Sequence, residues 1–167
     1  GLGDVYKRQD NLIVVQTFSK SRSMAGMRIG YAMASPELIK YLNDVKYSFN
    51  SYTMDQTALD LGVASIEDQA YFEETLHKII QTRERVKLRL TELGFTFCDS
   101  RSNFIFASHK SCPAEELFEK LKEKDIYVRY FNKPRIHNYL RITIGTDAEM
   151  DEFLSEVENY LKESGRL

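Results

Sequence analysis

The sequence predicts an α/β protein made of part of one lobe followed by a complete α+β lobe. Three observations carry this prediction. An apolar run at residues 12–15 leads into a loop rich in hydroxyl and basic side chains, a long amphipathic helical pattern covers residues 68–93, and short strand and helix patterns alternate after Gly94. With 167 residues, the chain is long enough for one domain or somewhat more.

Two strand patterns define the first lobe. Residues 12–15 are apolar on both faces, which is typical of a buried strand in a parallel sheet. Residues 28–34 alternate large and small side chains, so we expect a second strand whose small face admits another element closely. We interpret this lobe, residues 11–66, as the end of a larger domain's sheet.

Helical patterns follow the second strand. Ser35 and Pro36 suit the N-cap and first position of a helix that extends to about residue 49. Thr53 with Gln56 is typical of a capping box opening a second helix. A third helix over residues 68–93, ended by Gly94, is long enough to connect two lobes. We therefore assign residues 67–93 to a connecting helix.

Residues 94–164 are predicted to form the second, small α+β domain. The order is strand, strand, helix, strand, strand, helix, which favours a sheet with helices on one face. The expected elements are strands at 95–97, 103–106, 126–130 and 139–144, a helix opened by Pro113, and a final helix capped by Thr146 and Glu149.

Alternation along two of these strands places basic side chains on one face. Leu140 and Ile142 share a face, so Arg141 points to the other. By the same alternation Arg129 points away from Val128. Guanidinium groups on rigid strands are good receptors for carboxylate and phosphate, although exposed strand arginines of no function are an equally ordinary outcome.

Composition excludes several function classes. The net charge of −2 gives no basic excess for nucleic acid. Cys98 and Cys112 lack the spacing of a metal site, and we expect both as small apolar fillers and the three histidines at the surface. No apolar run is long enough to span a membrane, and no signal peptide is visible, so we expect a cytoplasmic protein. Residues 1–10 fit no pattern and are interpreted as a non-native junction.

The loop over residues 17–28 holds the main candidate site. Thr17, Ser19 and Arg28 suit a phosphate group, and Lys20 lies among them. A Walker loop is excluded because no glycine-rich run precedes the lysine. From the residues alone, Lys20 is either another phosphate contact or a nucleophile able to form a Schiff base.

Four segments carry a family resemblance. Residues 17–20 and 25–31 resemble the lysine segment of fold-type I pyridoxal-phosphate aminotransferases, within them the histidinol-phosphate aminotransferases. Residues 102–104 and 139–146 resemble small-domain segments of the same family, in the same order. The resemblance covers about residues 11–162.

This resemblance implies roles for seven residues. Lys20 would be the catalytic lysine that bonds to pyridoxal 5'-phosphate and shuttles a proton, with Thr17, Ser19 and Arg28 on the cofactor phosphate. Arg141 would bind the substrate α-carboxylate, or a phosphate in concert with Arg129, and Asn103 would lie near the carboxylate.

The resemblance also implies a reaction and a truncation. The reaction would be transamination of histidinol phosphate with 2-oxoglutarate in histidine biosynthesis, by a homodimer. The family's N-terminal half, which completes the cofactor pocket, would precede the lysine segment, so we expect these 167 residues to be an inactive fragment. The alternatives are an aromatic aminotransferase, a threonine-phosphate decarboxylase, or a phosphate-binding module without covalent chemistry.

Overall fold

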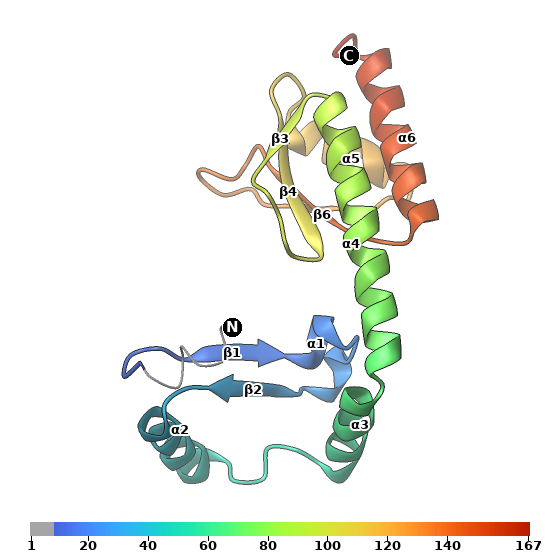
Figure 1. Ribbon diagram of the computed structural model, residues 1–167. Helices are drawn as coiled ribbons and strands as arrows, with labels where there is room; N and C mark the ends of the chain where they lie inside the picture. Colours follow the sequence, from blue (N-terminus) through green and yellow to red (C-terminus); the bar gives the residue numbers. More distant parts are fainter. Residues whose placement is uncertain (1–8) are drawn as a thin grey trace. The chain divides into compact units, whose positions relative to one another are not determined.

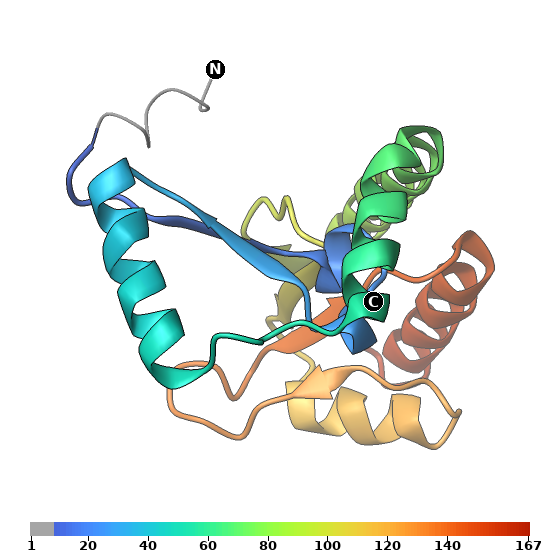
Figure 2. The same cartoon turned by 90° about the horizontal axis from the view of Figure 1, so that it is seen from below.

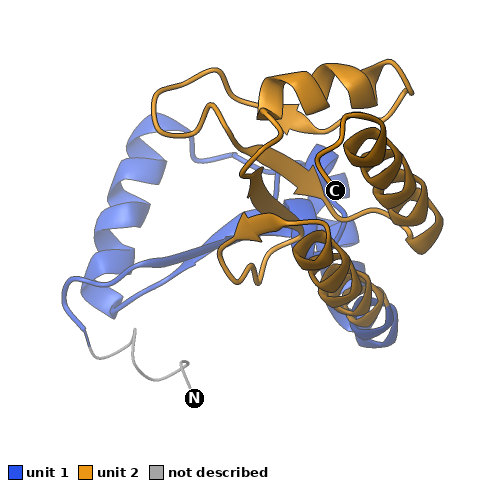
Figure 3. Ribbon diagram, turned by 90° about the horizontal axis from the view of Figure 1, so that it is seen from above, with its two compact units in different colours: residues 1–74 blue, residues 75–167 orange. Residues whose placement is uncertain are grey.

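The chain divides into two compact units. The computed structural model describes residues 9–167, so the junction expected over residues 1–10 lies almost entirely outside the described residues. Unit 1 comprises residues 1–74 and unit 2 residues 75–167 (Figure 3). The division falls within helix α4 (Gln69–Glu92).

The strands of unit 1 form an antiparallel pair. β1 (Val14–Thr17) pairs with β2 (Gly30–Met33), with Thr17 opposite Gly30 and Val14 opposite Met33 (Figure 1). The prediction of a buried strand in a parallel sheet is therefore wrong for this chain. The chain turns back through residues 18–29, which contain two short helical segments, so the neighbouring strand runs antiparallel. Val15 keeps 68% of its surface exposed because the described residues give β1 only this one neighbour.

Before α4, the described residues of unit 1 form the helical segments α1 (Phe18–Ser21), η2 (Ala25–Met27), α2 (Pro36–Phe49) and α3 (Gln56–Glu67). The predicted start of α2 is confirmed, since the Ser35 hydroxyl accepts a hydrogen bond from the Leu38 N–H. The capping box predicted at Thr53 is wrong. Asp55 directly precedes α3, and its carboxylate accepts the Ala58 N–H at 2.7 Å.

The core of unit 1 is small. Phe18, Ile29 and Ala58 are buried, and three methionines pack against them. An extended connection separates α2 from α3 (Figure 2), and the apolar face of α2 lies open, with Phe49 93% exposed. Helical periodicity therefore predicts α2 correctly. The apolar side chains on one face of α2 are not buried by the described residues.

Unit 2 has the predicted order of elements. After α4 come β3 (Phe95–Phe97), β4 (Phe104–His109), α5 (Ala114–Lys122), β5 (Arg129–Tyr130), β6 (Leu140–Thr143) and α6 (Asp147–Glu163). The strands form one antiparallel sheet in the order β3-β4-β6-β5. β5 is shorter than the strand predicted over residues 126–130, because only its last two residues pair with β6.

One face of this sheet carries the helices and the main core (Figure 1). Ile105, Leu140 and Ile142 are buried beneath side chains of α5, α6 and the second half of α4. The opposite face, which we call the open face, carries Arg129 and Arg141, both exposed. The prediction from strand alternation is confirmed.

Helix ends in unit 2 follow the predicted signals. Gly94 has φ +84° after α4, in the left-handed region that favours glycine. Thr146 and Glu149 form the predicted capping box of α6. Among the described residues, no helix combines the length and apolarity that crossing a membrane requires.

Two expectations about single side chains are wrong. His109 is 3% exposed rather than at the surface, because its ring satisfies backbone groups at both nitrogens: Leu93 O lies 3.0 Å from Nε2 and Cys112 N lies 3.0 Å from Nδ1. Cys98 is exposed rather than an apolar filler, since it lies just beyond β3, whereas Cys112 is buried as expected.

Candidate functional site

The predicted lysine segment is folded against the end of the β1–β2 pair. Phe18 is buried, and its N–H donates to Ile29 O at 3.0 Å, while its carbonyl accepts the Met24 N–H at 3.1 Å. Because Thr17 pairs with Gly30, the backbone at Arg28 returns next to α1, which contains Lys20. The four residues predicted in this loop therefore belong to backbone segments that meet at this end of the strand pair.

Their polar groups have open bonding capacity. Lys20 is exposed and, within residues 9–167, forms no ion pair. In the same part of the chain the hydroxyls of Thr17 and Ser19 form no hydrogen bond, and Thr17 does not cap α1 with its side chain. Arg28 has φ +56° and uses one terminal nitrogen on Ala25 O at 2.9 Å. Its other N–H donors are left for an external anion.

Arg22, the second arginine of this loop, has a different role. Its Nη1 donates to Ser65 O at 2.8 Å, and its guanidinium carbon lies 3.9 Å from the centroid of the Phe72 ring. Arg22 therefore ties the lysine loop to α3 and to the start of α4 within unit 1. In the sequence both arginines follow the lysine within eight residues, and the separate contacts of Arg22 arise only in the folded chain.

The predicted residues of unit 2 belong to β5, to β6 and to the residue that precedes β4. Arg129 and Arg141 are directly opposite one another in the β5–β6 pair. Neither forms an ion pair within the described residues, and both guanidinium groups lie near aromatic rings. Asn103 precedes β4, and its carbonyl accepts the Ile144 N–H at 2.9 Å, which extends the β4–β6 pairing.

A cavity of about 880 Å³ adjoins the open face. Phe104, Phe106 and Tyr139 form its apolar lining, and the exposed Arg101 and Arg135 lie at its edge. Phe106 stacks on Tyr139 with ring centroids 4.7 Å apart. Sequence reasoning missed this aromatic surface, although the alternation that places Arg141 on the open face also places Tyr139 there.

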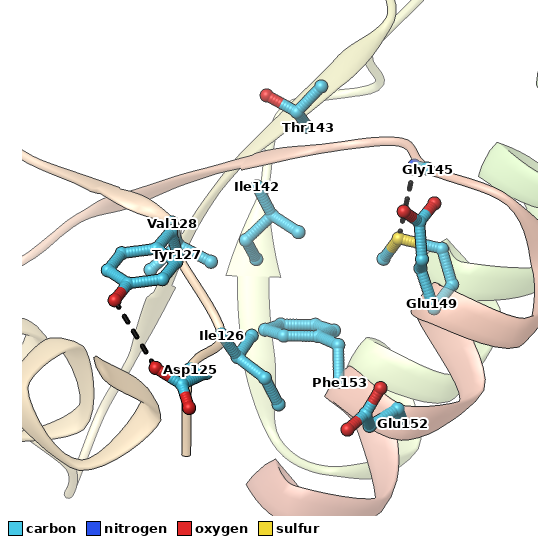
Figure 4. Close-up of a pocket in the computed structure, with 11 residues that line it drawn as sticks. Asp125, Ile126, Tyr127, Val128, Ile142, Thr143, Gly145, Glu149, Glu152 and Phe153 are labelled. Atoms are coloured by element: carbon cyan, nitrogen blue, oxygen red, sulfur yellow. Dashed lines mark hydrogen bonds between the residues drawn. The ribbon is translucent and has the colours of Figure 1, made fainter. Parts of the chain in front are cut away.

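A second cavity, of about 390 Å³, lies between α6 and the segment that leads into β5 (Figure 4). Asp125, Glu149 and Glu152 surround an apolar floor that includes Phe153. Its acidic edge is unsuited to an anionic substrate, and none of the predicted site residues lines it. No cluster of three potential metal ligands occurs among the described residues.

The sequence matches a known family model along most of its length. The model for aminotransferase class I and II matches residues 4–157. A histidinol-phosphate aminotransferase of Brachyspira hyodysenteriae is 53% identical over 156 residues. The match covers 93% of this chain and 44% of that protein, so the chain spans less than half the length of this curated relative.

Solved aminotransferase structures have the same fold as this chain over the aligned part. A putative histidinol-phosphate aminotransferase from Erwinia carotovora atroseptica aligns with a TM-score of 0.82 at 26% identity, over 94% of this chain and 44% of that one. The Sinorhizobium meliloti histidinol-phosphate aminotransferase, solved in complex with pyridoxal-5'-phosphate, aligns with a TM-score of 0.81 at 24% identity. That alignment covers 96% of this chain and 44% of the other. At this identity the second alignment supports the fold alone.

Proposed function

This chain belongs to the aminotransferase class I and II family, and we propose that it supplies the catalytic lysine and the anion-binding arginines of a pyridoxal-phosphate-dependent transaminase of histidinol phosphate. One observation carries the proposal. In a chain 53% identical to a histidinol-phosphate aminotransferase, an exposed amine at Lys20 lies in the same short loop as two hydroxyls and a guanidinium with open bonding capacity.

The loop residues suit the proposed cofactor. Thr17 and Ser19 each offer a hydroxyl, and Arg28 offers N–H donors that the described protein does not use. Together they provide a donor set for the cofactor phosphate. Pyridoxal phosphate, when bound, supplies the electron sink that allows an α-proton to leave the amino substrate. Lys20 provides the amine that anchors the cofactor covalently.

The proposed chemical role of Lys20 is proton transfer. With the cofactor and an amino substrate in place, the Nζ of Lys20 would act as the general base that takes the proton from the substrate α-carbon. Lys20 is exposed, and no carboxylate in the described part of unit 1 pairs with it. Replacing the amine removes both the covalent anchor and the proton carrier.

The proposed role of the arginine pair is recognition of acidic groups. Arg141 receives the α-carboxylate of glutamate in one half-reaction, and a phosphate together with Arg129 in the other. Asn103 is proposed to lie near the bound carboxylate. The support is the position of both guanidinium groups on the open face without ion-pair partners among residues 9–167.

The chain is shorter than the relative it matches, and this affects the activity that we expect from the chain by itself. We assign residues 11–66 to the end of a large domain, residues 67–93 to a connecting helix and residues 94–164 to a small domain. Because the chain spans 44% of its relative, we expect it to bind cofactor weakly and to lack turnover without the rest of the pocket. A homodimer is proposed for the whole protein, supported by the apolar face that α2 leaves open.

A chimera provides the test. This chain would replace the matching segment of the Brachyspira hyodysenteriae relative, and transamination of histidinol phosphate with 2-oxoglutarate would be measured as glutamate formed. We expect activity from the chimera and none from the 167 residues alone. Equal use of an aromatic amino acid without phosphate, or decarboxylation of threonine phosphate, would instead favour the two sister activities. Turnover by the 167 residues alone would contradict the fragment proposal.

A further inference from the structure

The ring of Phe131 lies near both arginines of the open face. Phe131 follows β5 directly, and its ring centroid is 5.5 Å from the guanidinium carbon of Arg129 and 5.8 Å from that of Arg141. Phe104 makes a second such contact with Arg141, at 5.6 Å. Distances below about 6 Å are typical of cation–π interactions. One ring therefore interacts with two guanidinium groups.

This arrangement offsets a charge repulsion without neutralising it. Like charges directly opposite in an antiparallel pair destabilise the sheet. Within the described residues no carboxylate pairs with Arg129 or Arg141. An aromatic face attracts the cations but accepts few of their N–H bonds, so the guanidinium donors are left for an anion from outside the protein.

The orientation of the Phe131 ring is itself fixed. Phe106 meets it edge to face, with centroids 6.3 Å apart and planes at 70°, and Tyr139 stacks on Phe106. The Phe131 carbonyl also accepts the Lys133 N–H at 2.8 Å, which holds the turn after β5. The ring therefore has a fixed orientation beside the guanidinium groups of Arg129 and Arg141.

We propose that Phe131 is a positioning residue that aims Arg129 and Arg141 at one shared oxyanion of the phosphate class. A phosphate has enough oxygens to accept donors from two guanidinium groups, whereas one arginine satisfies a carboxylate in a bidentate pair. The inference rests on the proposed function for the identity of the anion, which would be the substrate's phosphate. It deepens that function by naming the residue that holds the receptor together.

The test uses the 167-residue chain and two probes, inorganic phosphate and acetate. Binding would be followed by calorimetry and by the NMR signals of the arginine Nε–H groups. We expect Phe131→Leu to weaken phosphate binding about five- to thirtyfold, the equivalent of two lost cation–π contacts, and to change acetate binding less than about twofold. Phe131→Tyr retains the ring and should bind phosphate as the parent chain does.

Phe118→Leu is the matched control. Phe118 is also half-buried in unit 2 and contacts an aromatic ring and a lysine, but it belongs to α5 on the helical side of the sheet. The Phe118→Leu variant should be less stable than the parent chain but should bind phosphate with the same affinity.

Three results would overturn the inference: phosphate binding unchanged in Phe131→Leu, an equal loss in Phe118→Leu, or no phosphate binding by the parent chain. Failure of the proposed function would give a different result. The chimera would not transaminate, while Phe131→Leu would still weaken phosphate binding by the 167-residue chain.

Discussion

Arg129 and Arg141 face each other directly across the β5–β6 pair, and both are exposed on the face of the sheet that carries no helix. Two adjacent cations without a carboxylate between them are unfavourable for the sheet alone. Their arrangement supports the proposal that an anion binds both guanidinium groups.

The first prediction concerns Arg141. In the chimera, Arg141→Lys should lower kcat/KM for glutamate about ten- to a hundredfold, because an ammonium group cannot reproduce bidentate hydrogen bonding to a carboxylate. Steady-state kinetics would measure this. Arg101→Lys, which changes an exposed arginine that forms an ion pair with Asp99, serves as the control and should leave the kinetics unchanged. Equal effects of the two substitutions would contradict the role assigned to Arg141.

The second prediction separates the two arginines of the lysine loop. Arg28→Ala should weaken cofactor binding by the chimera with little change in its unfolding. Arg22→Ala should mainly destabilise the protein, by about 1–3 kcal/mol, because it removes the bond to Ser65 O and the contact with Phe72. Cofactor titration and thermal unfolding would distinguish them. Loss of cofactor binding in Arg22→Ala, together with loss of stability in Arg28→Ala, would contradict these two roles.

The third prediction concerns the end of α4. Gly94→Ala should destabilise unit 2 by about 1–2 kcal/mol, since an alanine at φ +84° is strained and its Cβ would lie 3.0 Å from His109 Nε2. Gly26→Ala is the control, because that glycine has no positive φ and no atom within 4 Å of the added carbon. Chemical denaturation would measure both, and equal stability of Gly94→Ala and the parent would refute the prediction.

The fourth prediction is a pH dependence from His109. Burial lowers the pKa of His109 below its ordinary value of 6.5, and the charges of Lys110 and Arg166 lower it further, against the opposing effect of the Leu93 carbonyl. The unfolded chain therefore binds the proton more readily than the folded one. Stability contributed by the neutral ring is present above about pH 6.5 and is lost as the pH falls below that value.

Denaturant titrations at several pH values would test this. The free energy of unfolding should fall as the pH drops below about 6.5, and His109→Gln should flatten that part of the profile. His77→Gln, at an exposed position, should leave the slope as it is in the parent. A slope that persists in His109→Gln would assign the pH dependence to other groups.

Much of unit 2 could be predicted from its sequence because its patterns are local. Alternation along β6 placed Arg141 and Ile142 on opposite faces of the sheet. The capping residue Thr146 located the start of α6, and Gly94 located the end of α4. His109 was misjudged because its burial depends on backbone groups of Leu93 and Cys112, which only the folded chain brings to it. No sequence pattern encodes such a contact.

Unit 1 was harder to predict for a different reason. The apolar run before Thr17 indicates burial, but burial needs neighbours that the described chain does not supply, so Val15 is exposed. The position of Arg28 beside α1, the short helix that contains Lys20, follows from the pairing of Thr17 with Gly30. The sequence alone does not specify this pairing. The residue types of the candidate site could be predicted, whereas the separate role of Arg22 could not.

The central claim is that Lys20 is the amine that bonds to pyridoxal phosphate. The most direct measurement is borohydride reduction of the chimera with the cofactor bound, followed by peptide mapping, with Lys20→Ala as the control. The account predicts that the cofactor label is fixed on Lys20 and that the control loses it. A folded chimera that binds the cofactor but carries its label on another lysine, or none at all, would contradict the account.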